Sequence, residues 1–161
     1  EKEMLSTSGW IGKSLTGAAS IILITGAGGV FGKVLQNSGI ADILGETLSG
    51  LNLSIWLPFL LAAAIKTAQG SSTVALITTA SIMAPMMQTL GFVDNLEKAM
   101  VVIAIGAGSA VVSHANDSFF WVVTQMSGMD TKMGYRMHTL GTLVLGTTAA
   151  VILFFVHLII N

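Results

Sequence analysis

Two short polar runs interrupt the long apolar stretches of this chain, and they hold most of the residues that could do chemistry. The first run is Gln69-Gly70-Ser71-Ser72-Thr73, and the second is Ser113-His114-Ala115-Asn116-Asp117-Ser118. Both are rich in residues that cap helix N-termini, so each run should open a helix. The N–H groups and the positive dipole end of such a helix stabilise an anion. Two broken helices that meet near the middle of a bilayer are typical of secondary transporters, so the runs predict a site for a small anion.

The side chains of both runs offer hydroxyl and amide groups to a hydroxylated anion. Gln69 and Gly70 are also expected to shape the turn of the first run. The predicted substrate-binding residues are Gln69, Gly70, Ser71, Ser72, Thr73, Ser113, Asn116 and Ser118.

Three ionisable residues lie in or beside the polar runs. An ionisable group within a membrane span is costly and is by default a functional candidate, so Asp117 is predicted to carry a coupled proton. The alternative is that its carboxylate only caps a helix. His114 could relay the proton, because imidazole titrates near neutral pH, or it could be a neutral ring bonded to a helix carbonyl. Lys66 could offset the negative charge of the substrate, or extend into an aqueous cavity.

The composition and the long apolar stretches together indicate an all-α integral membrane protein. The 161 residues are 53% hydrophobic and 9% charged, with a mean hydropathy of +0.81. A soluble domain is about a quarter charged, so this chain has too little charge to cover a surface in water. The formal net charge of −1 gives no reason to expect a nucleic-acid partner. There is no cysteine and no spacing typical of metal ligands or a catalytic triad, so we expect no cofactor, no metal and no enzymatic activity.

The hydropathy pattern predicts a single membrane domain over residues 1–161, because a helix needs about 20 apolar residues to cross a bilayer. Its predicted parts are a transmembrane helix at 14–36, an interfacial amphipathic stretch at 39–52, a helical hairpin at 53–90 with its tip at 69–73, a broken transmembrane helix at 98–129 with its break at 109–118, and a final transmembrane helix at 136–160.

The hairpin has two interpretations. It is either re-entrant, with its polar tip at mid-membrane, or a pair of full spans joined by a tight turn. Irregular backbone at that depth is tolerated only where it lines a cavity or is buried in protein. Lys132 and Arg136 make the loop before the final helix the most basic internal loop, which places this loop in the cytoplasm in both interpretations.

Three stretches of the chain closely resemble the gluconate permease family. They are the run from Ala62 to Ala75 that contains Lys66-Thr67-Ala68-Gln69-Gly70-Ser71-Ser72-Thr73, the run from Gly106 to Trp121, and the tail with Gly134-Tyr135-Arg136 and the final helix. The resemblance covers essentially the whole chain but only the C-terminal part of a full permease. The absence of an initiator Met fits a piece of a longer protein.

The resemblance implies a gluconate:proton symporter, or a relative that carries another sugar acid, in the bacterial inner membrane as a multi-pass protein. This family belongs to the ion-transporter superfamily, whose members are built from two inverted repeats. Each repeat carries a re-entrant hairpin and a broken helix that hold the substrate together. By that analogy, residues 69–73 are the tip and residues 113–118 are the break of the second repeat, and the N-terminal repeat is a missing partner. A homo-oligomer is compatible with this pattern.

Two other functions remain open from the sequence. A sodium-coupled or exchanging carboxylate carrier would use backbone carbonyls at the two breaks to coordinate sodium. A non-transporting membrane subunit or assembly module would use the polar runs only as turns. In that last case, replacing Asp117 by Asn would leave every activity of the complex unchanged.

Overall fold

The computed structural model of the chain describes residues 6, 9–38, 46–47, 50 and 53–160, and the described residues form only helices, turns and loops. The all-helical class predicted from the sequence is thus confirmed for this part of the chain. Most of the predicted interfacial stretch at 39–52 lies outside the described residues. The elements are α1 (Trp10–Ser38), α3 (Trp56–Gln69), α4 (Ser72–Met83), the 3₁₀ turn η1 (Ala84–Met86), α5 (Asn95–Ala110), α6 (Ser118–Met126), α7 (Thr131–Gly134), the π-helical turn η2 (Tyr135–Thr139) and α8 (Leu140–Ile160).

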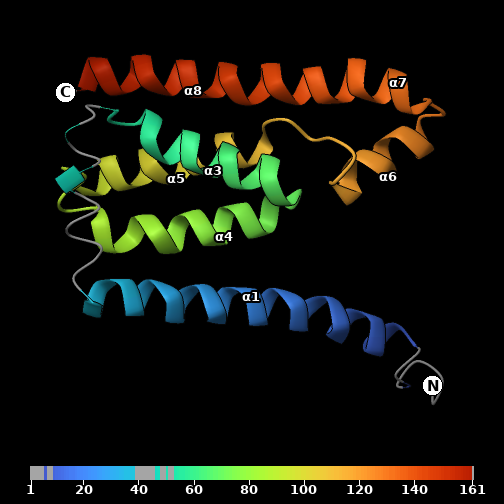
Figure 1. Cartoon of the computed structure of the whole chain (residues 1–161), viewed down its shortest axis with the longest axis horizontal. Coiled ribbons are helices and arrows are strands. Elements are labelled where there is room, and N and C mark those ends of the chain that lie inside the picture. The colour runs from blue at the N-terminus through green and yellow to red at the C-terminus, as the bar shows by residue number, and fades with distance from the viewer. Residues whose placement is uncertain (1–5, 7–8, 39–45, 48–49, 51–52, 161) are drawn as a thin grey trace.

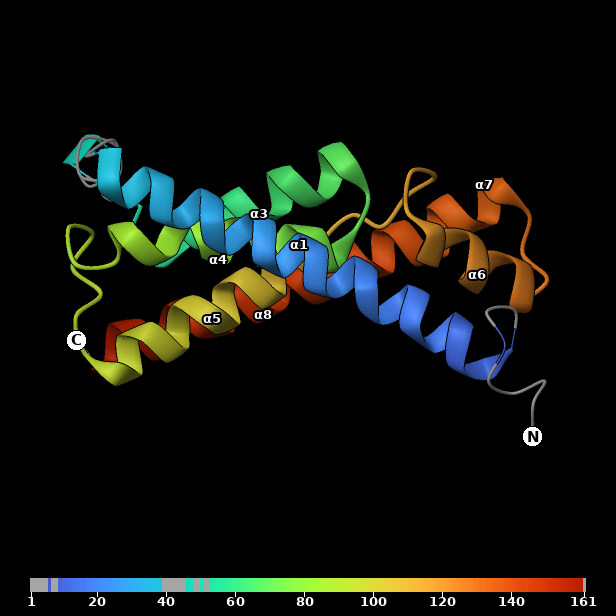
Figure 2. The ribbon, with the colours of Figure 1, turned by 90° about the horizontal axis from the view of Figure 1, so that it is seen from below.

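The helices are stacked side by side, with α8 along one side and α1 along the opposite side (Figure 1). Between them lie α3, α4 and α5, with α3 and α5 against α8 and α4 against α1. Figure 2 shows the same arrangement from below, with α1 crossing the stack and α5 lying along α8. In both views the turn between α3 and α4 faces the loop between α5 and α6.

Small residues bring α3, α5 and α8 into close contact. A Cβ atom at Gly108 of α5 would lie 2.2 Å from the Phe59 carbonyl oxygen of α3. A Cβ atom at Gly146 of α8 would lie 2.7 Å from the Ala107 carbonyl oxygen of α5. Glycine at such positions lets two helix backbones approach, as is common in membrane helix packing. The buried apolar cluster lies mainly along these helices and includes Phe59, Ala62, Met100, Val101, Ala104, Ile105, Val111, Ala150 and Leu153.

The first polar run forms the turn of the hairpin between α3 and α4. Gly70 ends α3 with φ of +88°, a left-handed conformation that favours glycine, and Ser71 caps α4 by accepting a hydrogen bond from Val74 N. At 1.5 Å per residue, α3 and α4 are about 21 Å and 18 Å long, and both are shorter than a bilayer core of about 30 Å.

The second polar run separates α5 from α6. Helix α5 begins with a capping box, in which Glu97 N donates to the Asp94 carboxylate and the Glu97 carboxylate accepts from Asp94 N. It ends at Ala110, and α6 begins after Asp117. Val112, between the two helices, has φ of +53°, which is unusual for a β-branched residue.

The last three elements form one continuous helical run from Thr131 to Ile160. Within the described residues, this run is the one helix whose length and apolar composition would let it cross a membrane by itself.

Candidate functional site

A buried ion pair joins the tip of the hairpin to the break between α5 and α6. The Lys66 ammonium of α3 lies 2.5 Å from Asp117 Oδ2, and it also donates to the Gly70 carbonyl oxygen at 2.7 Å. The two side chains are 1% and 6% exposed, so the pair is shielded from solvent within this chain. A buried charge is tolerated when it is paired and hydrogen-bonded, as both charges are here.

Asp117 uses both of its carboxylate oxygens. Ser113 Oγ donates to Oδ2 at 2.5 Å, and Phe119 N donates to Oδ1 at 2.9 Å. The second of these bonds makes Asp117 the N-cap of α6. The carboxylate therefore caps a helix, as one interpretation of the sequence expected, and in addition neutralises Lys66.

The backbone of the tip is seated directly on the backbone of the break. A Cβ atom at Gly70 would lie 2.2 Å from the Asn116 carbonyl oxygen, so only glycine fits there. Asn116 Nδ2 donates to the Thr67 carbonyl oxygen at 3.0 Å, and His114 Nε2 lies 3.2 Å from the same oxygen. The structure thus brings Lys66, Gly70, His114, Asn116 and Asp117 together at one contact.

The other predicted substrate-binding residues lie on the turn and at the starts of α4 and α6. Gln69 Nε2 donates to the Ser71 carbonyl oxygen at 3.0 Å, and Ser71 caps α4, so these two brace the turn. Within the described part of the chain, the hydroxyls of Ser72, Thr73 and Ser118 have no hydrogen-bond partner, and Thr73 and Ser118 are exposed. These three hydroxyls are free to bind another molecule.

Comparison with known proteins identifies the family. The family model of the GntP permeases matches residues 1–159. The chain belongs to the GntP family of permeases. It is 39% identical to the low-affinity gluconate transporter of Escherichia coli K12 over 88% of this chain, and 35% identical to the gluconate permease of Pseudomonas aeruginosa over 92% of it. It is 38% identical to the inner membrane permease YgbN of E. coli K12 over 91% of its length.

The resemblance seen in the sequence motifs is therefore confirmed. The GntP chain covers 32% of the length of each of these three relatives. No solved structure matches it.

Two threonines of the last helical run bond to the backbone of the break, and neither was among the residues predicted from the sequence. Thr139 Oγ1 donates to the Ser113 carbonyl oxygen at 2.6 Å, and Thr142 Oγ1 accepts from Ser113 N at 3.1 Å. Their spacing of three residues, which places them on one face of a helix, is the only signal that could have suggested a joint role.

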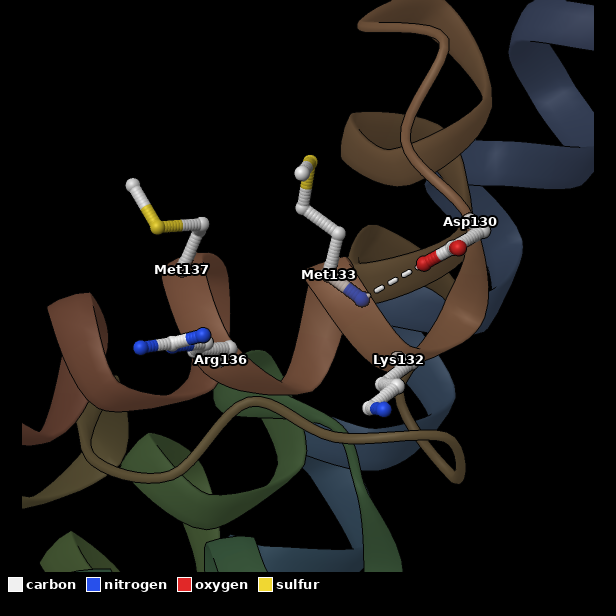
Figure 3. Close-up of a pocket in the computed structure, with 5 residues that line it drawn as sticks. All are labelled: Asp130, Lys132, Met133, Arg136 and Met137. Carbon is white, nitrogen blue, oxygen red and sulfur yellow. Dashed lines mark hydrogen bonds between the residues drawn. The ribbon is translucent and has the colours of Figure 1, made fainter.

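One surface cavity lies away from the contact between the hairpin tip and the break, at the start of the last helical run. It has a volume of about 360 Å³ and is lined by Asp130, Lys132, Met133, Arg136 and Met137 (Figure 3). Asp130 caps α7 by accepting a hydrogen bond from Met133 N at 2.7 Å. No predicted site residue lines this cavity. Its two cations, Lys132 and Arg136, were expected in a loop before the final helix, but they lie in the first turns of the helical run Thr131–Ile160.

Proposed function

We propose that this chain is part of a permease that carries gluconate, or a related sugar acid, across the bacterial inner membrane in symport with protons. Its family, and the names of relatives that are gluconate transporters and permeases, support the substrate class. The observation that carries the proposal for the site is the buried pair of Lys66 and Asp117, because it links the two polar breaks through opposite charges.

The pair supplies a simple way to couple a proton to an anion. When Asp117 is ionised, it neutralises Lys66, and a substrate carboxylate gains little from the ammonium. A proton on Asp117 removes this counter-charge and leaves the Lys66 ammonium buried without an anion. Because an unpaired buried charge is costly, a substrate carboxylate that enters is attracted to Lys66. Proton and sugar acid would then bind together and be released together.

The neighbouring residues suit the rest of a hydroxylated substrate. Ser72, Thr73 and Ser118 have unpaired hydroxyls at the starts of α4 and α6, where helix N-termini favour an anion. His114 lies against the same contact and is proposed to relay the proton. The shortness of α3 and α4 supports a re-entrant hairpin over two full spans. The remaining two thirds of the permease, including an N-terminal repeat, would complete the site.

The geometry gives less support to sodium coupling. Sodium would need free backbone carbonyls at the breaks, but the carbonyl oxygens of Thr67, Gly70 and Ser113 already accept hydrogen bonds from side chains. Proton coupling needs no free carbonyl, because the proton would bind the Asp117 carboxylate.

Uptake of labelled gluconate by cells that express the full-length parent, and that lack their own gluconate uptake, tests the proposed function. We expect saturable uptake that rises with an inward proton gradient, persists when sodium is replaced by choline, and is inhibited by other sugar acids. Cells carrying the empty vector are the control. Uptake no higher than in that control would refute gluconate transport, and a strict requirement for sodium would refute proton coupling.

A further inference from the structure

The last helical run has one irregular turn, and the helix is fixed to different neighbours on either side of it. The π-helical turn Tyr135–Thr139 interrupts the α-helical run Thr131–Ile160. Before this turn, Gly134 packs on α6, since a Cβ atom there would lie 2.3 Å from Thr124 Cγ2. After it, Gly146 packs on α5, since a Cβ atom there would lie 2.7 Å from the Ala107 carbonyl oxygen. The helix therefore has little freedom to rotate at either contact.

A π-turn adds a residue to one helical turn and changes the direction in which all later side chains point, and such turns are frequent at functional sites. Here Thr139, the last residue of the π-turn, and Thr142, three residues later, both bond through their hydroxyls to the backbone of Ser113. One hydroxyl donates to the Ser113 carbonyl oxygen at 2.6 Å, and the other accepts from Ser113 N at 3.1 Å. The Thr142 hydroxyl in turn donates to the Thr139 carbonyl oxygen at 3.0 Å. We call these two residues the threonine clamp.

The clamp acts on a strained segment. Val112, the residue before Ser113, has φ of +53°, where a β-branched side chain is unfavourable. Such a conformation persists only where the surrounding structure holds it. Ser113 is 3% exposed, and its own hydroxyl donates to Asp117. Holding the Ser113 backbone thus also fixes the hydroxyl that orients the Asp117 carboxylate.

We propose that Thr139 and Thr142 are positioning residues of the transport site, set in register by the π-turn, and that they hold the break in the strained form in which Ser113 binds Asp117. The expected effect of the clamp on transport rests on the proposed function. The effect of the clamp on the shape of the break does not depend on any substrate.

A labelling experiment in the full-length parent tests the clamp without a substrate. The chain has no cysteine, so Ala115→Cys adds the single thiol of this part of the permease, at a half-buried position in the break. In a background otherwise free of cysteine, Thr139→Val should raise the rate of labelling by a hydrophilic maleimide by about tenfold, the effect of one lost hydrogen bond. Thr147→Val is the matched control, because the Thr147 hydroxyl bonds only to carbonyls of its own helix.

Transport kinetics then separate positioning from a general loss of stability. Thr139→Val should raise the KM for gluconate by about tenfold, again the effect of one hydrogen bond, and Thr139→Ser should restore it because the hydroxyl is kept. If Thr139→Val does not reach the membrane, Thr142→Val, which removes the other hydroxyl of the clamp, takes its place in both assays. Equal labelling rates in the clamp variant and in Thr147→Val would overturn the proposal. If Thr139→Val is labelled faster than Thr147→Val but the parent does not transport gluconate, the proposed function is refuted and the positioning role of the clamp stands.

Discussion

Replacing Lys66 by Met in the full-length parent should reduce gluconate uptake by about a hundredfold or more. Removing one member of a buried ion pair typically costs about 3–5 kcal/mol, because the other charge is left buried without a partner. Asp117 would be that charge, since its side chain is 6% exposed and Lys66 is the only cation bonded to it within the described residues. The substrate carboxylate would also lose the ammonium that attracts it. Uptake and the midpoint of thermal unfolding in detergent are the two measurements.

Two further variants separate the loss of stability from the loss of binding. Adding Asp117→Asn to Lys66→Met removes the unpaired charge, so the double variant should regain most of its thermal stability but not its uptake. Lys98→Met is the matched control, because Lys98 is exposed near the start of α5 and has no partner among the described residues. Normal uptake by Lys66→Met, at normal expression, would mean that the ion pair is not part of the transport site.

Replacing Gly70 by Ala should abolish uptake. The added Cβ would lie 2.2 Å from the Asn116 carbonyl oxygen and 2.7 Å from its carbonyl carbon, and backbone atoms cannot move aside as a flexible side chain can. The tip would have to separate from the break, and the bonds from Lys66 to Asp117 and from Asn116 to Thr67 span this same contact. We expect gluconate uptake at background in transport assays on protein that still reaches the membrane.

Gly91→Ala controls for the strain of the backbone. Gly91 has φ of +87°, almost the same as the +88° of Gly70, but a Cβ atom added at Gly91 would meet no other atom within 4 Å. Both substitutions place alanine in a left-handed conformation, which costs about 1 kcal/mol. Gly91→Ala should therefore lower thermal stability slightly and leave uptake intact. Equal effects of the two substitutions would mean that strain alone, and not the contact between tip and break, is responsible.

The sequence alone was sufficient for the parts of the fold that depend on composition and local chemistry. Sparse charge predicted a membrane protein, the long apolar stretches predicted helices, and the helix-capping residues of the two polar runs predicted where helices begin. The structure has a turn at Gly70-Ser71 and a helix that starts after Asp117, both within those runs. These features follow from neighbouring residues, so no knowledge of the tertiary structure was needed to expect them.

The contacts across the site could not be derived in that way. Lys66 and Asp117 are 51 positions apart, and each had two plausible roles when considered separately. Only the packing of α3 on α5 makes them partners, and this packing depends on the size of residues such as Gly108. The left-handed conformation of Val112 and the π-turn at Tyr135–Thr139 are also imposed by tertiary contacts, since no local sequence preference favours either.

The most direct test of the proposed coupling compares Asp117→Asn with the unchanged full-length parent in membrane vesicles. Two activities are measured at several external pH values: accumulation of labelled gluconate driven by a proton gradient, and exchange of labelled for unlabelled gluconate without a gradient. Asn cannot take up the proton and always leaves Lys66 without a counter-charge. Exchange should therefore persist and become independent of pH, while driven accumulation is lost. Accumulation by Asp117→Asn with the pH dependence of the parent would contradict the proposal, because Asp117 would then not carry the coupled proton.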